Sequence, residues 1–247
     1  MNKVFAFTDI HGRYDLLKQI LDYMDETDKA YFLGDAADRG PDGVKCIFTL
    51  LNDKRITYLK GNHEDFFVSI GSEIIDRKYL HADLWRMNGG DKTMYDFENL
   101  DSFAQERLLS KLNLLPIHLT YVNKNNQFIH LSHAGYNIEA KPTDEKDFLW
   151  DRDHIVQEHW SKDEKYQNHY IVHGHTPVHY MYHKGGPILD LSNLKYCDNH
   201  KIDLDVACFQ TGAIPLLNLD TLEVEKYFYD DNVKSFMNKE GDEKENE

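Results

Sequence analysis

The chain has 247 residues, of which 41% are hydrophobic and 13% are aromatic, and this is enough to bury the core of one sizeable domain. Its 28 Lys and Arg residues stand against 43 Asp and Glu residues, so the formal net charge of -15 repels polyanions and argues against general nucleic-acid binding. Three scattered cysteines without a CxxC spacing argue against a disulfide framework and against a structural zinc site.

The N-terminal segment enters a strand-like run at once, from Lys3 to Phe7. It contains no apolar stretch long enough for a signal peptide, and no segment of the chain approaches the length of a membrane span. We therefore expect a cytoplasmic protein without a membrane partner.

Three strand–turn–helix units are predicted in the N-terminal part of the chain. Short β-prone runs end in glycine-containing turns, and apolar residues then recur at helical spacing. This alternation is typical of an α/β fold with crossover connections. The predicted strands cover residues 3–8, 30–33 and 56–59, and the predicted helices cover 13–23, 44–51 and 65–75.

The rest of the chain divides into a helical middle and a strand-rich C-terminal half. Residues 80–113 are predicted to be helical, and the polar segment 140–168 is predicted to be mostly loop. We expect a single domain over residues 1–237 and a disordered acidic tail over 238–247. The predicted strands of this half cover 116–122, 127–133, 169–173, 187–190, 203–209, 213–219 and 222–229.

Polar side chains follow several of the predicted strands, at the point where each strand ends. Singly, a strand-end Asp is usually a turn or helix cap, and a lone His is usually a structural residue. The whole set, beside glycines that permit tight turns, is hard to explain as caps, and open α/β sheets assemble their sites at the carboxyl ends of strands. We expect these side chains to converge on one crevice: Asp9, His11, Asp35, Asn62, His63, His133 and His175.

The types of donor in this set limit the metal that it would bind. Carboxylate, amide oxygen and imidazole without thiolate suit manganese, iron or zinc. Two such cations about 3.5–4 Å apart could share one carboxylate and one hydroxide. That hydroxide would be available near neutral pH to attack a phosphorus atom in line.

Five blocks of the sequence together resemble the phosphoprotein phosphatase (PPP) family of calcineurin-like metallophosphoesterases, and their order and spacing are closest to the phage lambda and bacterial protein phosphatases. The resemblance covers roughly residues 3–219 and extends to Asn88-Gly89-Gly90 and Trp150-Asp151-Arg152. GDxxDRG followed by GNHE is a specific combination. The blocks are Asp9-Ile10-His11-Gly12, GDAADRG at 34–40, GNHE at 61–64, His133-Ala134-Gly135 and HGHTP at 173–177.

The resemblance implies a sandwich of two mixed β-sheets flanked by helices, with two metal ions at the strand ends on one edge. Manganese is the expected metal, with iron or zinc as alternatives. By the resemblance, Asp35 would bridge both ions. Asp9 and His11 would hold the first ion, and the second would be held by Asn62, His133 and His175.

The resemblance also implies roles in catalysis. His63 would be the general acid that protonates the leaving alkoxide, and Asp38 would orient it through a hydrogen bond. Arg39 and Arg152 would clamp the phosphate oxygens, because a planar guanidinium offers paired donors. Asn88 would either shape the floor of the cleft or cap a helix.

Residues beside these motifs have plainer interpretations. Glu64 is expected to support its turn, and His130 is expected to be structural, while His173 would either support His175 or pack in the core. Thr8 stands where the family usually has glycine, and we interpret it as a packing change. Pro177 replaces the second histidine of the GHxH motif of nuclease-like relatives, which weakens a nuclease assignment.

These features predict a serine/threonine protein phosphatase that also accepts phosphotyrosine and small phosphate esters. A dinucleoside polyphosphate hydrolase is the first alternative, and it would need a base-stacking pocket. The candidates for such a pocket are equally explained as core or cleft wall: Trp85, Tyr95, Phe97 and Tyr136. A catalytically inactive binding module is the alternative of another class, and the complete set of donors argues against it.

Overall fold

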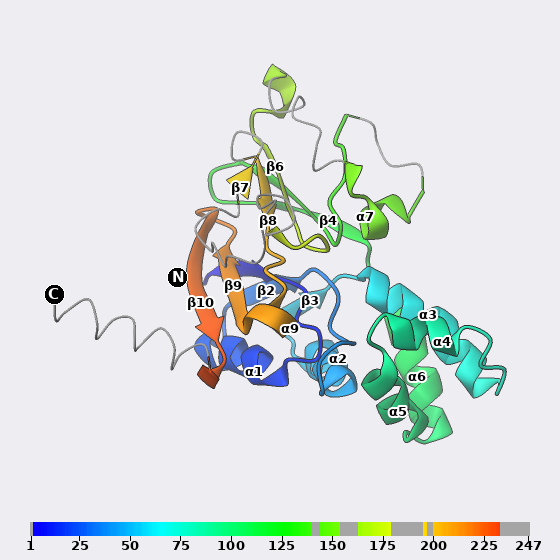
Figure 1. The fold of residues 1–247 in the computed structure, drawn as a ribbon. Coiled ribbons are helices and arrows are strands. Elements are labelled where there is room, and N and C mark those ends of the chain that lie inside the picture. The colour runs from blue at the N-terminus through cyan, green and yellow to red at the C-terminus, as the bar shows by residue number, and fades with distance from the viewer. Residues whose placement is uncertain (1, 140–143, 154–162, 179–194, 197–199, 233–247) are drawn as a thin grey trace, which may run out of the picture.

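Two five-stranded mixed sheets are stacked face to face, with helices around them (Figure 1). This confirms the expected α/β sandwich. The strand expected over 187–190 and the tail expected over 238–247 lie outside the described residues. The computed structural model describes residues 2–139, 144–153, 163–178, 195–196 and 200–232.

The first sheet has the strand order β10-β9-β1-β2-β3. Its strands β1, β2 and β3 are parallel, and β9 and β10 extend it in antiparallel fashion. The helices α1 (Tyr14–Tyr23) and α2 (Gly43–Asn52) connect the parallel strands. The strands are β1 (Val4–Phe7), β2 (Lys29–Phe32), β3 (Ile56–Tyr58), β9 (Ala213–Asn218) and β10 (Glu223–Tyr229).

The second sheet has the strand order β4-β5-β6-β8-β7. Strands β5, β6 and β8 are parallel, whereas β4 pairs with β5, and β7 with β8, in antiparallel fashion. The strands are β4 (His118–Val122), β5 (Phe128–Ser132), β6 (His169–His173), β7 (Lys195–Tyr196) and β8 (Lys201–Asp203).

The strand predicted over 203–209 is wrong for most of its length. Strand β8 ends at Asp203, and the chain turns into the short helix α9 (Cys208–Thr211). Ala207 adopts a left-handed conformation with φ 53°, and its N–H donates to the Asp205 carboxylate at 2.8 Å. Alternating apolar residues predict a strand in this segment, whereas its turn depends on hydrogen bonds that periodicity does not reveal.

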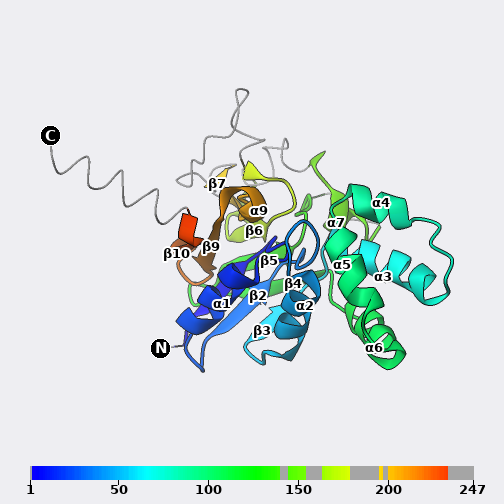
Figure 2. The ribbon, with the colours of Figure 1, turned by 60° about the horizontal axis from the view of Figure 1, so that its bottom comes forward.

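A group of helices stands beside the two sheets (Figures 1 and 2). These helices confirm the helical prediction for residues 80–113, and α3 begins earlier than expected, at Asn62. The segment predicted as loop contains only short helices among its described residues, α7 (Asp147–Trp150) and η3 (Glu164–Tyr166). The lateral group consists of α3 (Asn62–Ile75), α4 (Ala82–Met87), α5 (Asp91–Glu98) and α6 (Ser102–Asn113).

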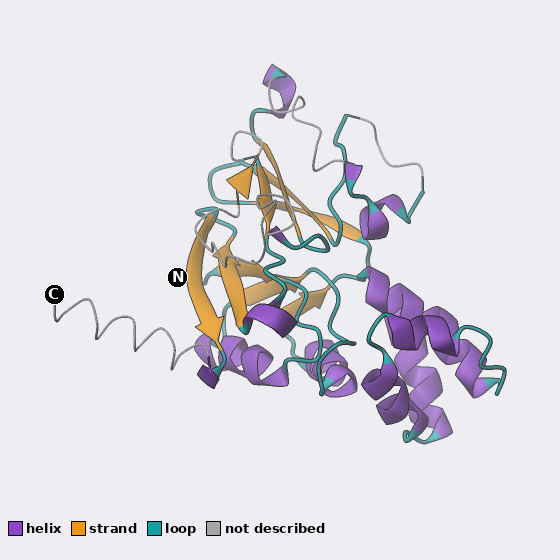
Figure 3. Ribbon diagram, viewed as in Figure 1, coloured by secondary structure: helices purple, strands orange, loops and turns teal. Residues whose placement is uncertain are grey.

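Strand β1 is buried on both faces, and its side chains alternate between two cores. Phe5 and Phe7 pack into the layer that includes Ile20 of α1, on the helix-covered face of the sheet (Figure 3). Ala6 points the other way and packs in the core between the sheets, which includes Leu131 and Val172. Each buried Phe contributes about 1.5–3 kcal/mol by leaving water, so β1 is fixed in register where it delivers the residues of the site.

No helix among the described residues combines the length and the apolarity that a bilayer span requires.

The Arg55 side chain joins the end of α1 to the start of β3. Its guanidinium donates to the carbonyl oxygens of Leu21 and Met24, at 3.0 and 2.8 Å, and forms an ion pair with Asp53. Hydrogen bonding to Arg55 lowers the pKa of the Asp53 carboxyl from its ordinary value of 3.8. Because the folded-state pKa lies below the unfolded value, this pair stabilises the fold above pH 3.8.

We predict that Asp53→Asn lowers the free energy of unfolding at pH 7 by roughly 0.5–1 kcal/mol, since the pair is partly exposed. The difference in unfolding free energy should shrink as the pH falls through the lowered pKa of Asp53, because the wild-type Asp53 carboxylate is then protonated and loses its charge. Urea unfolding at pH 7 and at acidic pH measures both effects, with Glu26→Gln on the exposed surface as the control. A difference from wild type that is the same at every pH would contradict this assignment.

Candidate metal centre

The polar residues predicted from the strand ends do come together, in the turns that follow β1, β2, β3, β5 and β6. Several of them have left-handed backbone conformations, with φ of 50° at Asp9, 62° at Asp35 and 72° at His175. Such conformations are costly for residues other than glycine, and they persist where the surrounding structure enforces them, often at functional sites. Tight turns of this kind direct consecutive polar side chains toward one point instead of letting the strand continue.

Two glycines allow these turns to approach one another. A Cβ atom on Gly61 would lie 2.3 Å from Asp35 Oδ1, and a Cβ atom on Gly40 would lie 2.2 Å from the His11 carbonyl oxygen. Neither space admits a side chain. The glycines of the GNHE and GDAADRG motifs are thus required by the contact between turns.

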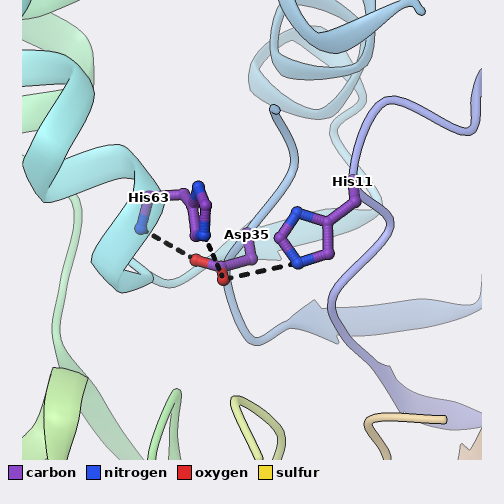
Figure 4. A group of neighbouring side chains, drawn as sticks. All are labelled: His11, Asp35 and His63. Carbon is purple, nitrogen blue, oxygen red and sulfur yellow. Dashed lines mark hydrogen bonds and ion pairs between the residues drawn. The ribbon is translucent and has the colours of Figure 1, made fainter. Parts of the chain in front are cut away.

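Asp35 lies at the middle of the cluster, between His11 and His63 (Figure 4). Its Oδ2 atom is 3.7 Å from His11 Nε2 and 3.8 Å from His63 Nε2. Its Oδ1 atom is 3.4 Å from His133 Nε2 and accepts the His63 backbone N–H at 3.0 Å. One carboxylate therefore belongs to two groups of potential ligands, His11-Asp35-His63 and Asp9-Asp35-His133.

Asp9 and His11 form one side of the cluster, with Asp9 Oδ1 3.8 Å from His11 Nε2. His11 Nδ1 lies 2.9 Å from the Ala37 carbonyl oxygen, which can only accept, so Nδ1 carries the proton and Nε2 keeps its lone pair. The other Asp9 oxygen accepts hydrogen bonds from Thr8 Oγ1 at 2.6 Å and from the His175 N–H at 3.2 Å. Thr8 is thus more than the packing change expected from sequence, because it orients the carboxylate.

Asn62, His133 and His175 form the other side. Asn62 Oδ1 lies 2.7 Å from His133 Nε2 and 3.0 Å from His175 Nδ1. His133 Nδ1 donates to the Leu33 carbonyl oxygen at 2.9 Å, which directs Nε2 toward Asn62 Oδ1 and Asp35. His175 Nε2 is buried without a hydrogen-bond partner, so this imidazole is incompletely satisfied by the described residues.

Burial and mutual charge set the protonation of these groups. Burial raises the pKa of the Asp9 carboxyl. Burial would also raise the pKa of Asp35, but the neighbouring His133 and His63 outweigh it and hold that pKa well below its ordinary value. The pKa of His133 is raised to about 10, because Asp35 and Asp9 outweigh the effect of burial.

These residues fit a pair of divalent transition metal ions. Buried carboxylates in proteins are paired with cations or coordinate metals, and here two of them lie among imidazole nitrogens and an amide oxygen. The incompletely satisfied His175 and the Nε2 atoms of His11 and His133, which face the carboxylates, are the donors that such ions require.

His63 is held beside this cluster by Asp38, as predicted. His63 Nδ1 lies 2.6 Å from Asp38 Oδ2, which leaves Nε2 facing Asp35. Burial lowers the pKa of His63, but Asp35 and Asp38 outweigh it, so the pKa is raised. The imidazole can therefore carry a second proton, on the nitrogen that faces the cluster.

Arg39 reaches the same place from a left-handed backbone with φ 64°. Its guanidinium nitrogens lie 2.8 Å from His11 Nε2 and 3.2 Å from His63 Nε2. Its backbone N–H donates to the Gly89 carbonyl oxygen at 2.8 Å, so the Asn-Gly-Gly block supports this arginine through the main chain. The Phe209 ring lies 4.9 Å from the guanidinium carbon, a contact that the sequence did not suggest.

Arg152 and Asn88 are more peripheral. Arg152 is exposed and donates to Thr176 Oγ1 at 2.8 Å, next to His175. The Asn88 amide donates to the Leu84 carbonyl oxygen at 2.8 Å, so its side chain takes the helix-capping alternative.

Glu64 supports its turn, as expected. Its buried carboxylate accepts the backbone N–H groups of Asp35, Ala36 and Gly61, each at 2.8 Å. The Tyr58 hydroxyl donates to it at the same distance. One side chain thus ties the turn after β2 to the turn after β3.

The aromatic residues considered for base stacking do not gather at the site. Trp85 and Phe97 are fully buried, and Tyr136 is also buried. Tyr95 is 62% exposed on α5. The Trp85 indole instead donates to the Asp38 carboxylate. The sequence does not predict this interaction, because a Trp on an amphipathic helix is normally interpreted as a core residue.

Comparisons with known proteins show what the chain as a whole is similar to. A family model described as calcineurin-like phosphoesterase matches residues 3–208. Serine/threonine-protein phosphatase 1 of Salmonella typhimurium strain LT2 is 28% identical over 163 residues, which are 63% of this chain and 71% of that protein. A symmetrical bis(5'-nucleosyl)-tetraphosphatase of Buchnera aphidicola subsp. Schizaphis graminum is 33% identical over 79 residues, which are 30% of this chain and 29% of that protein.

A solved structure of a proposed diadenosine tetraphosphatase has the same fold, with a TM-score of 0.60 and 14% sequence identity. The superposition covers 92% of this chain and 93% of that chain. At this identity the likeness concerns the fold alone.

We predict that chelation of divalent cations destabilises the protein, because Asp9 and Asp35 are then left buried side by side. Mn²⁺ at a hundredfold excess over its dissociation constant should raise the free energy of unfolding by about 2.7 kcal/mol. Asp35→Asn should lose most of this gain and bind less than two equivalents of Mn²⁺. Thermal melts measure the stabilisation and metal analysis of the dialysed protein measures the bound Mn²⁺, with the exposed Asp83→Asn as the control. An Asp35→Asn protein that holds two Mn²⁺ ions would refute the assignment of Asp35 as a ligand shared by both ions.

Proposed function

The chain belongs to the calcineurin-like phosphoesterase family, and on that premise we propose that it is a metal-dependent serine/threonine protein phosphatase that also hydrolyses phosphotyrosine and small aryl phosphates. The observation that carries the proposal is the buried Asp35 carboxylate, which faces His11 with one oxygen and His133 with the other, beside the His63 imidazole that Asp38 holds.

Two metal ions would share Asp35, and the remaining ligands divide as the two sides of the cluster do. In this proposal Asp9 and His11 hold the first ion. When bound, the ions supply a water activated for attack on phosphorus and neutralise the charge of the phosphate oxygens. The second ion would be held by Asn62, His133 and His175.

The other side chains bind the phosphoryl group and handle the proton. Arg39 lies within hydrogen-bond distance of both His11 and His63, so its guanidinium is placed to bind the oxygens of a phosphate group held beside these two histidines. Arg152 would bind the phosphate from the His175 side. His63 would donate its Nε2 proton to the leaving oxygen, because its Nδ1 is committed to Asp38.

Three observations favour a protein substrate over a dinucleotide. The net charge of -15 disfavours a polyanionic substrate, and the candidate base-stacking residues Trp85 and Phe97 are buried in the core. In addition, the similarity to the protein phosphatase spans 71% of that relative, against 29% for the tetraphosphatase of Buchnera. The complete set of donors also argues against an inactive binding module.

The first functional prediction concerns the substrate. Metal-depleted protein restored with Mn²⁺ should hydrolyse a phosphothreonine peptide with a higher kcat/KM than diadenosine tetraphosphate, measured in direct competition. Asp35→Asn should lose both activities. If the nucleotide were cleaved far more efficiently, the metal chemistry would stand, and the substrate assignment would move to dinucleoside polyphosphates.

The second prediction concerns His63. His63→Asn should retain bound metal but lose about 10²–10⁴-fold in kcat on phosphoserine and phosphothreonine peptides, whose alkoxide leaving groups need a proton. The loss on p-nitrophenyl phosphate should be much smaller, since nitrophenolate leaves unaided. His81→Asn, at an exposed histidine, serves as the control. Unchanged turnover of the phosphoserine peptide would remove His63 from the acid role.

A further inference from the structure

The indole of Trp85 makes a hydrogen bond to Asp38, the carboxylate that orients His63. Trp85 on α4 is fully buried, and its Nε1–H group lies 3.0 Å from each oxygen of the Asp38 carboxylate. Asp38 is fully buried as well. Within the described part of the chain, no other donor reaches Asp38 Oδ1, so this oxygen depends on the indole.

The carboxylate of Asp38 thereby has hydrogen-bond partners on two different helices. Its Oδ2 lies 2.6 Å from His63 Nδ1 of α3, and the indole N–H of Trp85 reaches both of its oxygens from α4. A carboxylate held only by His63 could rotate about its Cβ–Cγ bond, and the imidazole could follow it. Donors from two helices restrict that rotation, and a buried carboxylate oxygen left without a partner would be destabilising.

The indole itself is fixed by packing. Its ring lies 4.9 Å from the Phe67 ring, and Phe67 lies 5.1 Å from the Phe97 ring. Phe67 is on α3, one helical turn after His63, so the helix that carries the acid also contacts the indole. A Cβ atom on Gly90 would lie 2.1 Å from Trp85 Cδ1, which shows how closely the main chain encloses the ring.

We propose that Trp85 is a positioning residue for proton donation: its N–H fixes the Asp38 carboxylate, which in turn holds His63 with Nε2 directed at the leaving oxygen. A buried Trp needs a partner for its N–H wherever it packs. Here that partner is the carboxylate that orients the acid, so the indole extends the pair Asp38–His63 to a row of three. The inference rests on the proposed role of His63.

The test separates proton donation from general damage to the fold. Trp85→Phe keeps an aromatic ring and removes the N–H. We expect kcat on a phosphothreonine peptide to fall about 10–100-fold, as when an outer hydrogen-bond partner of a functional histidine is removed. KM should change little, and kcat on p-nitrophenyl phosphate should stay within about twofold.

Two variants control this experiment. Phe97→Leu loosens the same aromatic cluster without touching a hydrogen bond, and should affect both substrates equally. Gly90→Ala keeps the indole but displaces it, and should reproduce the selective loss even if Trp85→Phe does not fold. In Trp85→Phe combined with Asp38→Asn, the loss should not exceed that of Asp38→Asn alone. Equal losses on both substrates in Trp85→Phe and Gly90→Ala would overturn the proposal.

A spectroscopic measurement does not depend on the identity of the substrate. The proton between His63 Nδ1 and Asp38 should give a far-downfield proton NMR resonance that exchanges slowly with water in the wild-type protein. In Trp85→Phe or Gly90→Ala it should shift and exchange faster. An unchanged resonance would refute the positioning role, whereas a wild-type protein that shows this resonance but hydrolyses no phosphate ester would refute the proposed function instead.

Discussion

The buried carboxylate of Asp35 is the constraint on which the rest of the site depends. It is removed from water at the edge between the sheets, yet it stays in the charged form, because imidazoles approach both of its oxygens. A carboxylate in this position is costly unless every lone pair is satisfied. The His63 main-chain N–H satisfies part of the need, and two cations are the natural complement to the remainder.

The backbone around Asp35 is shaped by that need. Asp35, Asp38 and Arg39 all have positive φ within a few residues, and each such residue costs of order 1–3 kcal/mol. Glu64 holds this turn in place by accepting the main-chain N–H groups of Asp35 and Ala36, and it ties the turn to the next one through Gly61. The motifs thus contain both the residues with strained backbone conformations and the glutamate whose hydrogen bonds offset that strain. The motif residues therefore shape the turn as well as supplying the functional groups of the site.

A second layer of side chains decides how the functional groups are aimed. Thr8 orients Asp9, Trp85 contacts Asp38, and Phe209 lies against Arg39. Two of these contacts join residues that are far apart in sequence: Phe209 of α9 contacts Arg39, and Trp85 of the lateral helices contacts Asp38. The helical group beside the sheets is therefore connected to the metal centre through Asp38, and does more than cover the core.

The sequence by itself determined the family, the α/β sandwich and the cluster of polar residues at the strand ends, because short motifs with fixed spacing and strand–turn–helix alternation are local features. It did not predict the turn at Ala207, where a side-chain hydrogen bond replaces a strand, and it left two alternatives open for Asn88, of which the structure takes the helix cap. The tertiary structure alone decided that Thr8 and Trp85 hold the carboxylates of Asp9 and Asp38. The bond from Trp85 leaves no trace in periodicity, since a hydrogen bond between distant elements depends on how those elements pack. The bond from Thr8 to the adjacent Asp9 depends on the orientation that the folded site gives both side chains.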